Sequence, residues 1–173
     1  MSLHIIIDGY NLIRQSSKLS VLDNQDIQFG RDALISDLSA YKKMKAHRIT
    51  VVFDGTNAPP ASDRRTRVRG IDIRFSARGE LADQLINRMV IKSGAQAMVV
   101  TSDRAVADFA IHHGAAAISS REFEDKLAMA AYMDAKGLET EDNEGWTPTT
   151  KKKGPNRRLK KKDRRIKAKA QKL

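Results

Sequence analysis

The chain has 173 residues, enough for one domain of ordinary size with a real hydrophobic core. It contains no cysteine, which excludes disulfide bonds and thiolate-bound zinc. No apolar run approaches the roughly 20 residues of a membrane-spanning helix, and the opening MSLHIII lacks the features of a signal peptide. We therefore expect a cytoplasmic location and no membrane partner.

The net charge of +11 is distributed unevenly along the chain. Residues 151–173 carry 13 Lys or Arg and a single acid, whereas residues 1–150 carry 19 basic and 20 acidic residues. The chain is thus a nearly neutral domain with a strongly basic C-terminal tail. Such a tail most often binds nucleic acid or another polyanion, although a solubilising tail without a partner is an alternative.

The first predicted elements are strands separated by one long helix. A strand at 3–8 precedes a helix at 26–45, in which apolar residues recur every three or four positions. A strand at 48–54 then leads into a loop at 55–66. Apolar and polar residues alternate over 68–75, which predicts a more exposed strand.

The second half of the domain continues the alternation. A helix is predicted at 79–92, with Leu81, Leu85, Met89 and Val90 facing inward. It is followed by a strand at 95–101, a helix at 103–113, a strand at 115–119 and a helix at 120–136. This order predicts an α/β fold with a mainly parallel sheet and helices on both faces.

The composition changes near residue 138. We assign residues 1–137 to the folded domain, 138–150 to an acidic linker and 151–173 to the basic tail. The tail has too few apolar residues to form a core, so we expect it to be disordered when unbound.

Three predicted strands end on an aspartate. The segments IIIDGYN, VVFDGTN and VVTSDR place Asp8 and Asp54 directly after apolar runs and Asp103 three positions after Val100. Each aspartate alone is well explained as a helix cap or turn residue. In a parallel α/β sheet, however, all three would lie at the carboxyl edge, where ligands bind.

The helix at 79–92 adds two more acids. Glu80 and Asp83 are three residues apart, so they would share a helix face. Converging carboxylates repel one another, and a hard divalent cation relieves that repulsion. Oxygen-only ligands suit Mg²⁺ or Mn²⁺, and a metal beside a basic surface is suited to phosphodiester hydrolysis.

Basic residues suitable for binding a phosphate backbone follow the second and third of these acids. Arginine recognises phosphate through a planar fork of donors. The candidates are Arg64, Arg65, Arg67, Arg69, Arg78 and Arg104, with Lys160, Lys161 and Lys162 in the tail. A solvated loop without a ligand is the alternative explanation for the cluster at 64–69.

The segments IIIDGYNLI, VVFDG, FSARGELADQLI and VVTSD occur in an order that resembles the YacP-like NYN domain family, a bacterial branch of the PIN-like nucleases. The resemblance covers roughly residues 3–135 and implies a PIN-like sheet and metal-dependent endoribonuclease activity. Members of this branch include a ribosome-associated endonuclease that cuts mRNA. The resemblance therefore implies that the partner is RNA, and mRNA in particular. It also implies that the basic tail binds the ribosome.

The same resemblance implies roles for individual residues. It makes Asp8, Asp83 and Asp103 acids of the metal site, and Asn11 a polar companion of Asp8. It matches Glu80 to the Gly-Glu pair of the family. The remaining motif acid, Asp54, is a further candidate ligand.

Two departures from the family pattern leave a second hypothesis open. Relatives in the wider NYN group often have acids where this chain has Gln84 and Ala107. The chain could accordingly bind RNA or the ribosome with a weak or inactive nuclease site. A third hypothesis, an aspartyl-phosphate phosphatase, ranks low because such enzymes usually need a second Asp at the position of Tyr10.

Overall fold

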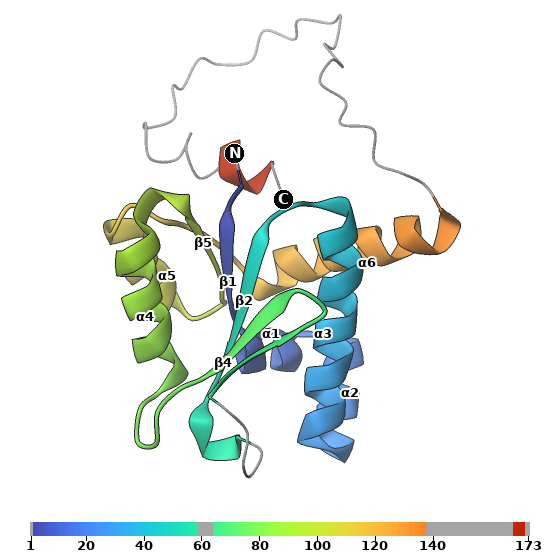
Figure 1. Ribbon diagram of the computed structural model, residues 1–173, viewed down its shortest axis with the longest axis horizontal. Helices are drawn as coiled ribbons and strands as arrows, with labels where there is room; N and C mark the ends of the chain where they lie inside the picture. The colour runs from blue at the N-terminus through green and yellow to red at the C-terminus, as the bar shows by residue number, and fades with distance from the viewer. Residues whose placement is uncertain (1, 59–63, 138–167, 172–173) are drawn as a thin grey trace, which may run out of the picture.

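The computed structural model describes residues 2–58, 64–137 and 168–171 and contains a six-stranded sheet between helices (Figure 1). The strands are β1 (His4–Asp8), β2 (Arg48–Phe53), β3 (Arg65–Val68), β4 (Ile71–Phe75), β5 (Ala97–Val100) and β6 (Ala116–Ile118). The helices are α1 (Gly9–Gln15), α2 (Ser17–Gln25), α3 (Ile27–Met44), α4 (Ala82–Ser93), α5 (Arg104–His112) and α6 (Ser120–Lys136), with short 3₁₀ turns η1 (Gly55–Asn57) and η2 (Gly94–Gln96). None of the helices within these ranges is both long and apolar enough to cross a membrane.

The sheet is mainly parallel, as the alternation of elements predicts. Its strand order is β3-β4-β2-β1-β5-β6, and every neighbouring pair is parallel except β3 and β4. The central strand β1 pairs with β2 on one side and β5 on the other. The carboxyl ends of β1, β2, β4 and β5 therefore lie at one edge of the sheet.

Helices cover both faces of the sheet, which confirms the predicted α/β class. One face packs its apolar side chains with those of α1, α3 and α6, and includes Ile5 and Ile7 of β1. The other face buries Ile6 of β1 against Ile86 of α4 and Val106 of α5. Figure 1 shows α4 and α5 on the side of the sheet opposite α3. The alternating side chains of β1 thus belong to two separate cores.

The segment between the first strand and the long helix contains two short helices that the sequence did not predict. Asp8 caps α1, and Ser16, which ends α1, also caps α2 by accepting a hydrogen bond from the Leu19 amide at 3.2 Å. Helices of 7 and 9 residues carry little apolar periodicity. Their signal lies in the caps instead.

The prediction of one exposed strand at 68–75 is wrong, because this segment belongs to a β-hairpin. Arg69 and Gly70 have φ angles of 50° and 80°, the left-handed conformation of a tight two-residue hairpin turn. The strand before the turn, β3, begins at Arg65, inside the predicted loop, and is exposed along its length. The strand after it, β4, is largely buried because it pairs with β2.

The helix predicted at 79–92 starts later than expected. Gly79 has a φ of 79°, and the Glu80 amide donates to the Ala77 carbonyl, so these residues form a turn before α4 begins at Ala82. Leu81 is therefore 60% exposed, contrary to the prediction. The buried residues of α4 include Met89 and Val90, as predicted, together with Ile86.

The acidic linker and most of the basic tail, including Lys160, Lys161 and Lys162, lie outside the described residues. Within the tail, residues 168–170 form a helical turn. Lys169 Nζ donates to the Ala95 carbonyl, which places this turn beside η2.

Candidate active site

The three strand-end aspartates are all helix caps. Asp8 Oδ1 accepts from the Asn11 amide at 3.3 Å, Asp54 Oδ1 accepts from the Thr56 amide at 2.8 Å, and Asp103 Oδ1 accepts from the Ala105 amide at 2.7 Å. The simple structural explanation therefore holds for each of them. Each of these bonds holds one carboxylate oxygen against the start of the following helix or turn and thereby restricts the direction in which the carboxylate points.

The tertiary structure brings these caps into electrostatic range of one another. Burial is the main cause that raises the pKa of Asp8 from 3.8 to about 6, and the charges of Asp83 and Asp103 raise it further. Burial also raises the pKa of Asp83, as do the charges of Asp103 and Asp54. Carboxylates from β1, the loop after β2, α4 and the loop after β5 thus share one negative region, which we call the acidic edge.

The acidic edge is open rather than enclosed. Asp8 is buried, Asp54 and Asp83 are half-buried, and Asp103 is exposed. Across residues 2–58, 64–137 and 168–171, no three His, Asp or Glu side chains are close enough to form a metal-binding group. The acids lie at one edge of the sheet, as expected, but they do not form a closed group of metal ligands.

Thr101, which the sequence analysis did not select, connects two of the acids. Its hydroxyl donates to Asp8 Oδ2 at 3.4 Å and accepts from the Asp103 amide at 3.1 Å, and the residue is 2% exposed. The first of these bonds lowers the pKa of Asp8, against the effect of burial. A single threonine at a strand end carries no signal of this role, because its partner Asp8 is 93 positions away.

Asn11 holds the loop that carries Asp103. Its Oδ1 accepts from the Ser102 amide at 2.8 Å and from the Ser120 hydroxyl at 2.7 Å. The side chain thus joins α1 to the start of α5 and the start of α6. The backbone N–H of Asn11 donates to Asp8 Oδ1, while its side chain contacts Ser102 and Ser120.

Glu80 does not share a helix face with Asp83, contrary to the prediction, because it lies in the turn before α4. Its Oε2 accepts from the Ala77 amide at 2.9 Å, and its Oε1 forms an ion pair with Arg88. Hydrogen bonds from Arg88 and Ala77 lower the pKa of Glu80. The contacts of Glu80 therefore hold the turn that leads to Asp83.

Ser76, another residue missed by the sequence analysis, ties the loop after β2 to the loop after β4. Its hydroxyl accepts from the Gly55 amide at 2.9 Å and donates to the Glu80 carbonyl at 2.6 Å. A Cβ at position 55 would overlap the Ser76 carbonyl, so this approach requires glycine. Close packing against Ser76 therefore explains the glycine of the VVFDG segment.

The predicted phosphate-binding arginines do not gather around the acids. Arg64 precedes β3 at the acidic edge, whereas Arg69 lies in the hairpin turn at the opposite end and donates to Ser36 Oγ at 3.4 Å. Arg65 and Arg67 lie between them on β3. Two other exposed arginines adjoin the acidic edge: Arg78 before α4 and Arg104 beside Asp103.

The two departures from the family pattern have structural consequences. Gln84 Oε1 accepts from the Leu81 amide at 3.3 Å, so this side chain caps α4. Ala107 is half-buried on α5, and the neighbouring Asp108 is exposed. Tyr10 is 6% exposed and packs on Phe53 at a ring distance of 5.0 Å, which places it in the core.

The mainly parallel sheet with acids at its carboxyl edge agrees with the PIN-like nuclease fold of the YacP-like NYN family. The profile of the YacP-like NYN domain matches residues 5–171, and the chain belongs to this family. Membership in this nuclease superfamily indicates a nuclease or RNA-related role, and PIN-like nucleases generally use divalent metal ions.

Known proteins agree with the family assignment. The chain is 28% identical over 102 residues to YacP of Bacillus subtilis strain 168, a protein described as uncharacterised, and the match spans 57% of this chain and 59% of that relative. The crystal structure of Rae1 (YacP) from Bacillus subtilis is similar, with a TM-score of 0.66 and 26% identity over 79% of each chain. A mutant of that protein matches with a TM-score of 0.61 and 26% identity, over 75% of this chain and 76% of the mutant.

Proposed function

We propose that the protein is a metal-dependent endoribonuclease that hydrolyses phosphodiester bonds at the acidic edge. The observation that carries the proposal is that three acids from separate elements share one edge: besides burial, the charges of Asp83 and Asp103 raise the pKa of Asp8, and the charge of Asp103 raises the pKa of Asp83. Groups of like charge are held together at this cost where a site is built for an opposite charge.

The donor set fits Mg²⁺ or Mn²⁺ because it consists of carboxylate oxygens. Asp8, Asp83 and Asp103 would hold the cation, with Asp54 as a further ligand. When bound, the cation supplies an activated water and neutralises charge on the phosphodiester. The open arrangement of the acids favours a site in which several ligands are water molecules.

The residues of the chain itself have separate tasks in this mechanism. Asp8, whose pKa is raised mainly by burial to about 6, is still mostly ionised near neutral pH and so can hold the cation as a carboxylate. Thr101 and Asn11 position Asp8 and Asp103, while Glu80 positions the turn before Asp83. Arg104 and Arg78 would bind the phosphates on either side of the scissile bond.

We further propose that the substrate is mRNA on the ribosome, in the cytoplasm. The family assignment and the basic composition of residues 151–173 support this substrate. Phosphate contacts from the tail and from Arg64, Arg65, Arg67 and Arg69 would hold RNA without reading its sequence.

A second candidate function is RNA or ribosome binding with little catalysis. The open acidic edge and the capping role of Gln84 favour it. A cleavage assay with purified RNA distinguishes the two functions. We expect cleavage with Mg²⁺, loss of cleavage with EDTA, and loss of cleavage in Asp8→Asn.

Asp108→Asn is the matched control for this assay. It removes one negative charge from an exposed position on α5 and should cleave like the native protein. Cleavage that persists equally in Asp8→Asn would refute the nuclease and leave the binding function.

A further inference from the structure

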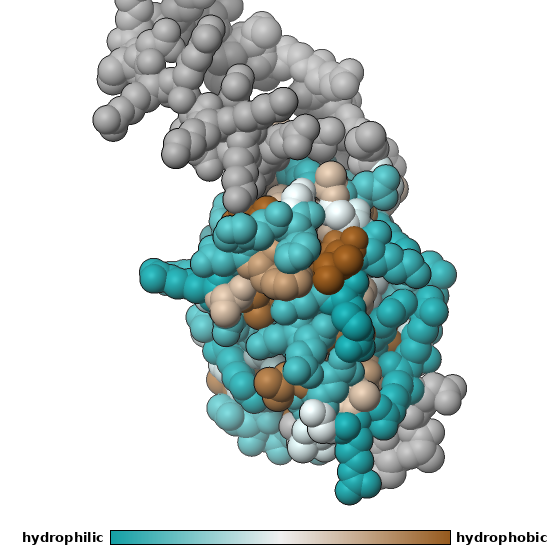
Figure 2. Space-filling view, turned by 90° about the vertical axis from the view of Figure 1, so that its left-hand side faces the viewer, coloured by the Kyte–Doolittle hydropathy of each residue, from teal (hydrophilic) through white to brown (hydrophobic). Residues whose placement is uncertain are grey.

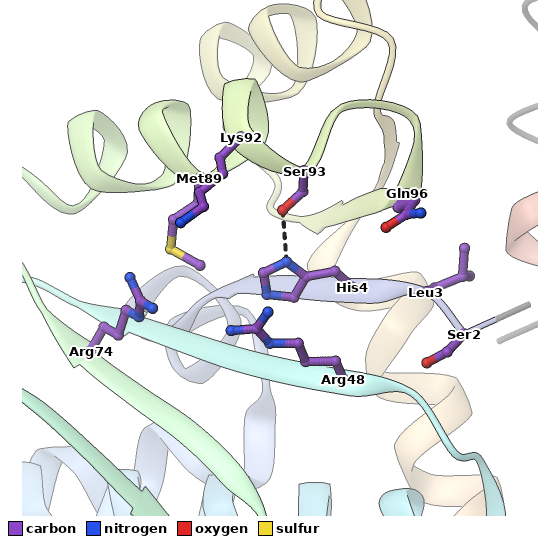
Figure 3. A pocket seen from close by; sticks show the side chains of 9 residues that line it. All are labelled: Ser2, Leu3, His4, Arg48, Arg74, Met89, Lys92, Ser93 and Gln96. Atoms are coloured by element: carbon purple, nitrogen blue, oxygen red, sulfur yellow. Dashed lines mark hydrogen bonds between the residues drawn. The ribbon is translucent and has the colours of Figure 1, made fainter.

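A second polar site lies at the amino end of the sheet, away from the acidic edge. A cavity of about 440 Å³ opens there between α4 and the starts of β1 and β2 (Figure 3). His4 begins β1 and Asp8 ends it, so the cavity is about 13 Å from the acidic edge along the strand. The cavity is lined by Ser2, Leu3, His4, Arg48, Arg74, Met89, Lys92, Ser93 and Gln96.

The cavity is cationic. The guanidinium groups of Arg48 and Arg74 lie on the strand side of His4, across from Lys92 and Ser93 of α4 (Figure 3). Asp72 pairs with Arg48 at 3.5 Å and is also 3.9 Å from Arg67, so one carboxylate serves two arginines. The charges of the lining residues are therefore only partly compensated.

The surroundings of Arg74 favour an anion in the cavity. Its Nε atom is buried and has no hydrogen-bond partner within the described part of the chain. Burial lowers the pKa of Arg74, and the charges of Arg65 and Arg48 lower it further. An anion in the cavity would offset this repulsion.

His4 forms a neutral wall of the cavity. Its Nδ1 is hydrogen-bonded to Ser93 Oγ and its Nε2 to Thr50 Oγ1, both at 2.9 Å. Burial, followed by the charges of Arg48 and Arg74, lowers the pKa of His4 to about 4. Its ring thus joins α4 to β1 and β2 while the positive charge stays on the arginines and Lys92.

The basic surface continues beyond the cavity. In the register of the β3–β4 hairpin, Arg65 lies opposite Arg74 and Arg67 lies opposite Asp72. Both arginines therefore extend the same face of the sheet. The basic tail reaches the other rim, where Lys169 binds the Ala95 carbonyl beside Gln96. In Figure 2 the side of the molecule that carries α4 is mostly hydrophilic, with separate apolar spots.

We infer that Arg48, Arg74 and Lys92 in this cavity bind a phosphate group of an RNA strand that also reaches the acidic edge. Guanidinium forks are suited to phosphate, and the cationic face along β3 suits a chain of phosphates better than one free anion. The inference rests on the proposed function in naming RNA, and it adds an anchoring site remote from the reacting bond.

The test measures RNA binding in EDTA, so that binding is separated from cleavage. The double variant Arg48→Gln/Lys92→Gln removes one ion-paired and one exposed cation from the cavity. The matched control Lys43→Gln/Lys136→Gln removes one ion-paired and one exposed cation from α3 and α6. Fluorescence anisotropy over a salt series would use RNAs of about 4 and about 12 nucleotides, with thermal unfolding to check folding.

We expect the double variant to bind the longer RNA more weakly and to reduce the slope of log K against log salt by about 0.7, the value for one lost phosphate contact on a single strand. The control should change the slope much less, and the short RNA should not distinguish the proteins. An unchanged slope in the folded double variant, and in Lys92→Glu as a second variant, would overturn the inference.

Inorganic phosphate alone distinguishes the two possible sources of the anion. If phosphate raises the thermal stability of the native protein but not of the double variant, while RNA binding is equal in both, the cavity takes a free phosphate and the RNA assignment is wrong. The binding series stays interpretable even if Mg²⁺-dependent cleavage is not found, so failure of the nuclease proposal would be seen separately.

Discussion

The two ends of the sheet have opposite chemistry built on the same strand. At its carboxyl end, β1 places Asp8 among other acids, and at its amino end it places His4 among arginines. Burial is the largest cause of both pKa shifts, and it favours the neutral form in each case: the pKa of Asp8 rises to about 6 and that of His4 falls to about 4. Nearby like charges then add to burial at both ends.

The ends differ in how their charges are held. Backbone amides at the starts of α1, η1 and α5 bind the acids, so capping geometry orients them. The cations come from strand side chains and from α4, and Asp72 is shared between two of them. Local capping thus orients Asp8, Asp54 and Asp103 of the acidic edge, whereas the basic cavity depends on the packing of α4 against the strands.

The largest expected effect concerns the acids themselves. Asp83→Asn and Asp103→Asn should each reduce Mg²⁺-dependent RNA cleavage by at least about 100-fold, because each loses several kcal/mol of transition-state stabilisation. Glu80→Gln should reduce it much less, since Glu80 binds Arg88 and Ala77. Single-turnover cleavage rates check this, and equal losses in all three variants would place Glu80 in the metal site.

The next largest effect is on stability: Asp8→Asn should stabilise the protein, although it should abolish cleavage. The folded protein holds the Asp8 proton more tightly than the unfolded chain, so the free energy of unfolding falls as pH rises from 3.8 to about 6. Asp8→Asn keeps a good helix cap and removes this cost. It should stabilise the protein by about 2–3 kcal/mol at neutral pH.

Urea unfolding of the Asp8→Asn protein at pH 7.5 and pH 4, beside Asp108→Asn, measures this difference. The gain should nearly vanish at pH 4, where native Asp8 is mostly protonated. A gain of the same size at both pH values would show that ionisation of Asp8 is not its source.

A smaller effect is expected from the link between two acids. Thr101→Val removes the hydroxyl that bonds Asp8 and the Asp103 amide, leaving that amide without its partner. The variant should lose about 1–2 kcal/mol of stability, and the acidic limb of its pH–rate profile should move to higher pH. Thr101→Ser keeps the hydroxyl and should behave like the native protein, so an unshifted profile in the valine variant would contradict this role.

The smallest effect is at the other end of β1. The folded state disfavours protonated His4, so stability falls as pH drops from 6.5 to about 4. His4→Gln should abolish this loss, which we put at about 1 kcal/mol because the ring is partly solvent-screened. Unfolding curves between pH 4 and pH 7 measure it, and a variant with the same pH dependence as the native protein would show that His4 does not titrate in this way.

Local patterns in the sequence were sufficient for much of the fold and for the candidate acids. The three isoleucines of β1 mark a buried strand, and the aspartates after β1 and β5 combine strand-end and helix-cap signals that involve only neighbouring residues. The alternation of elements then predicts a parallel sheet, and a parallel sheet puts Asp8 and Asp103 at one edge. Composition alone separates the neutral domain from the basic tail.

Only the tertiary structure decided which distant side chains meet. The Thr101–Asp8 bond needs β5 beside β1, and the basic cavity needs α4 over the starts of β1 and β2 with a hairpin beside them. The late start of α4 and the pairing of Glu80 with Arg88 likewise follow from a glycine turn and from packing. Helix caps and periodicity depend on residues a few positions apart, whereas contacts across 90 positions depend on strand order, which no local pattern encodes.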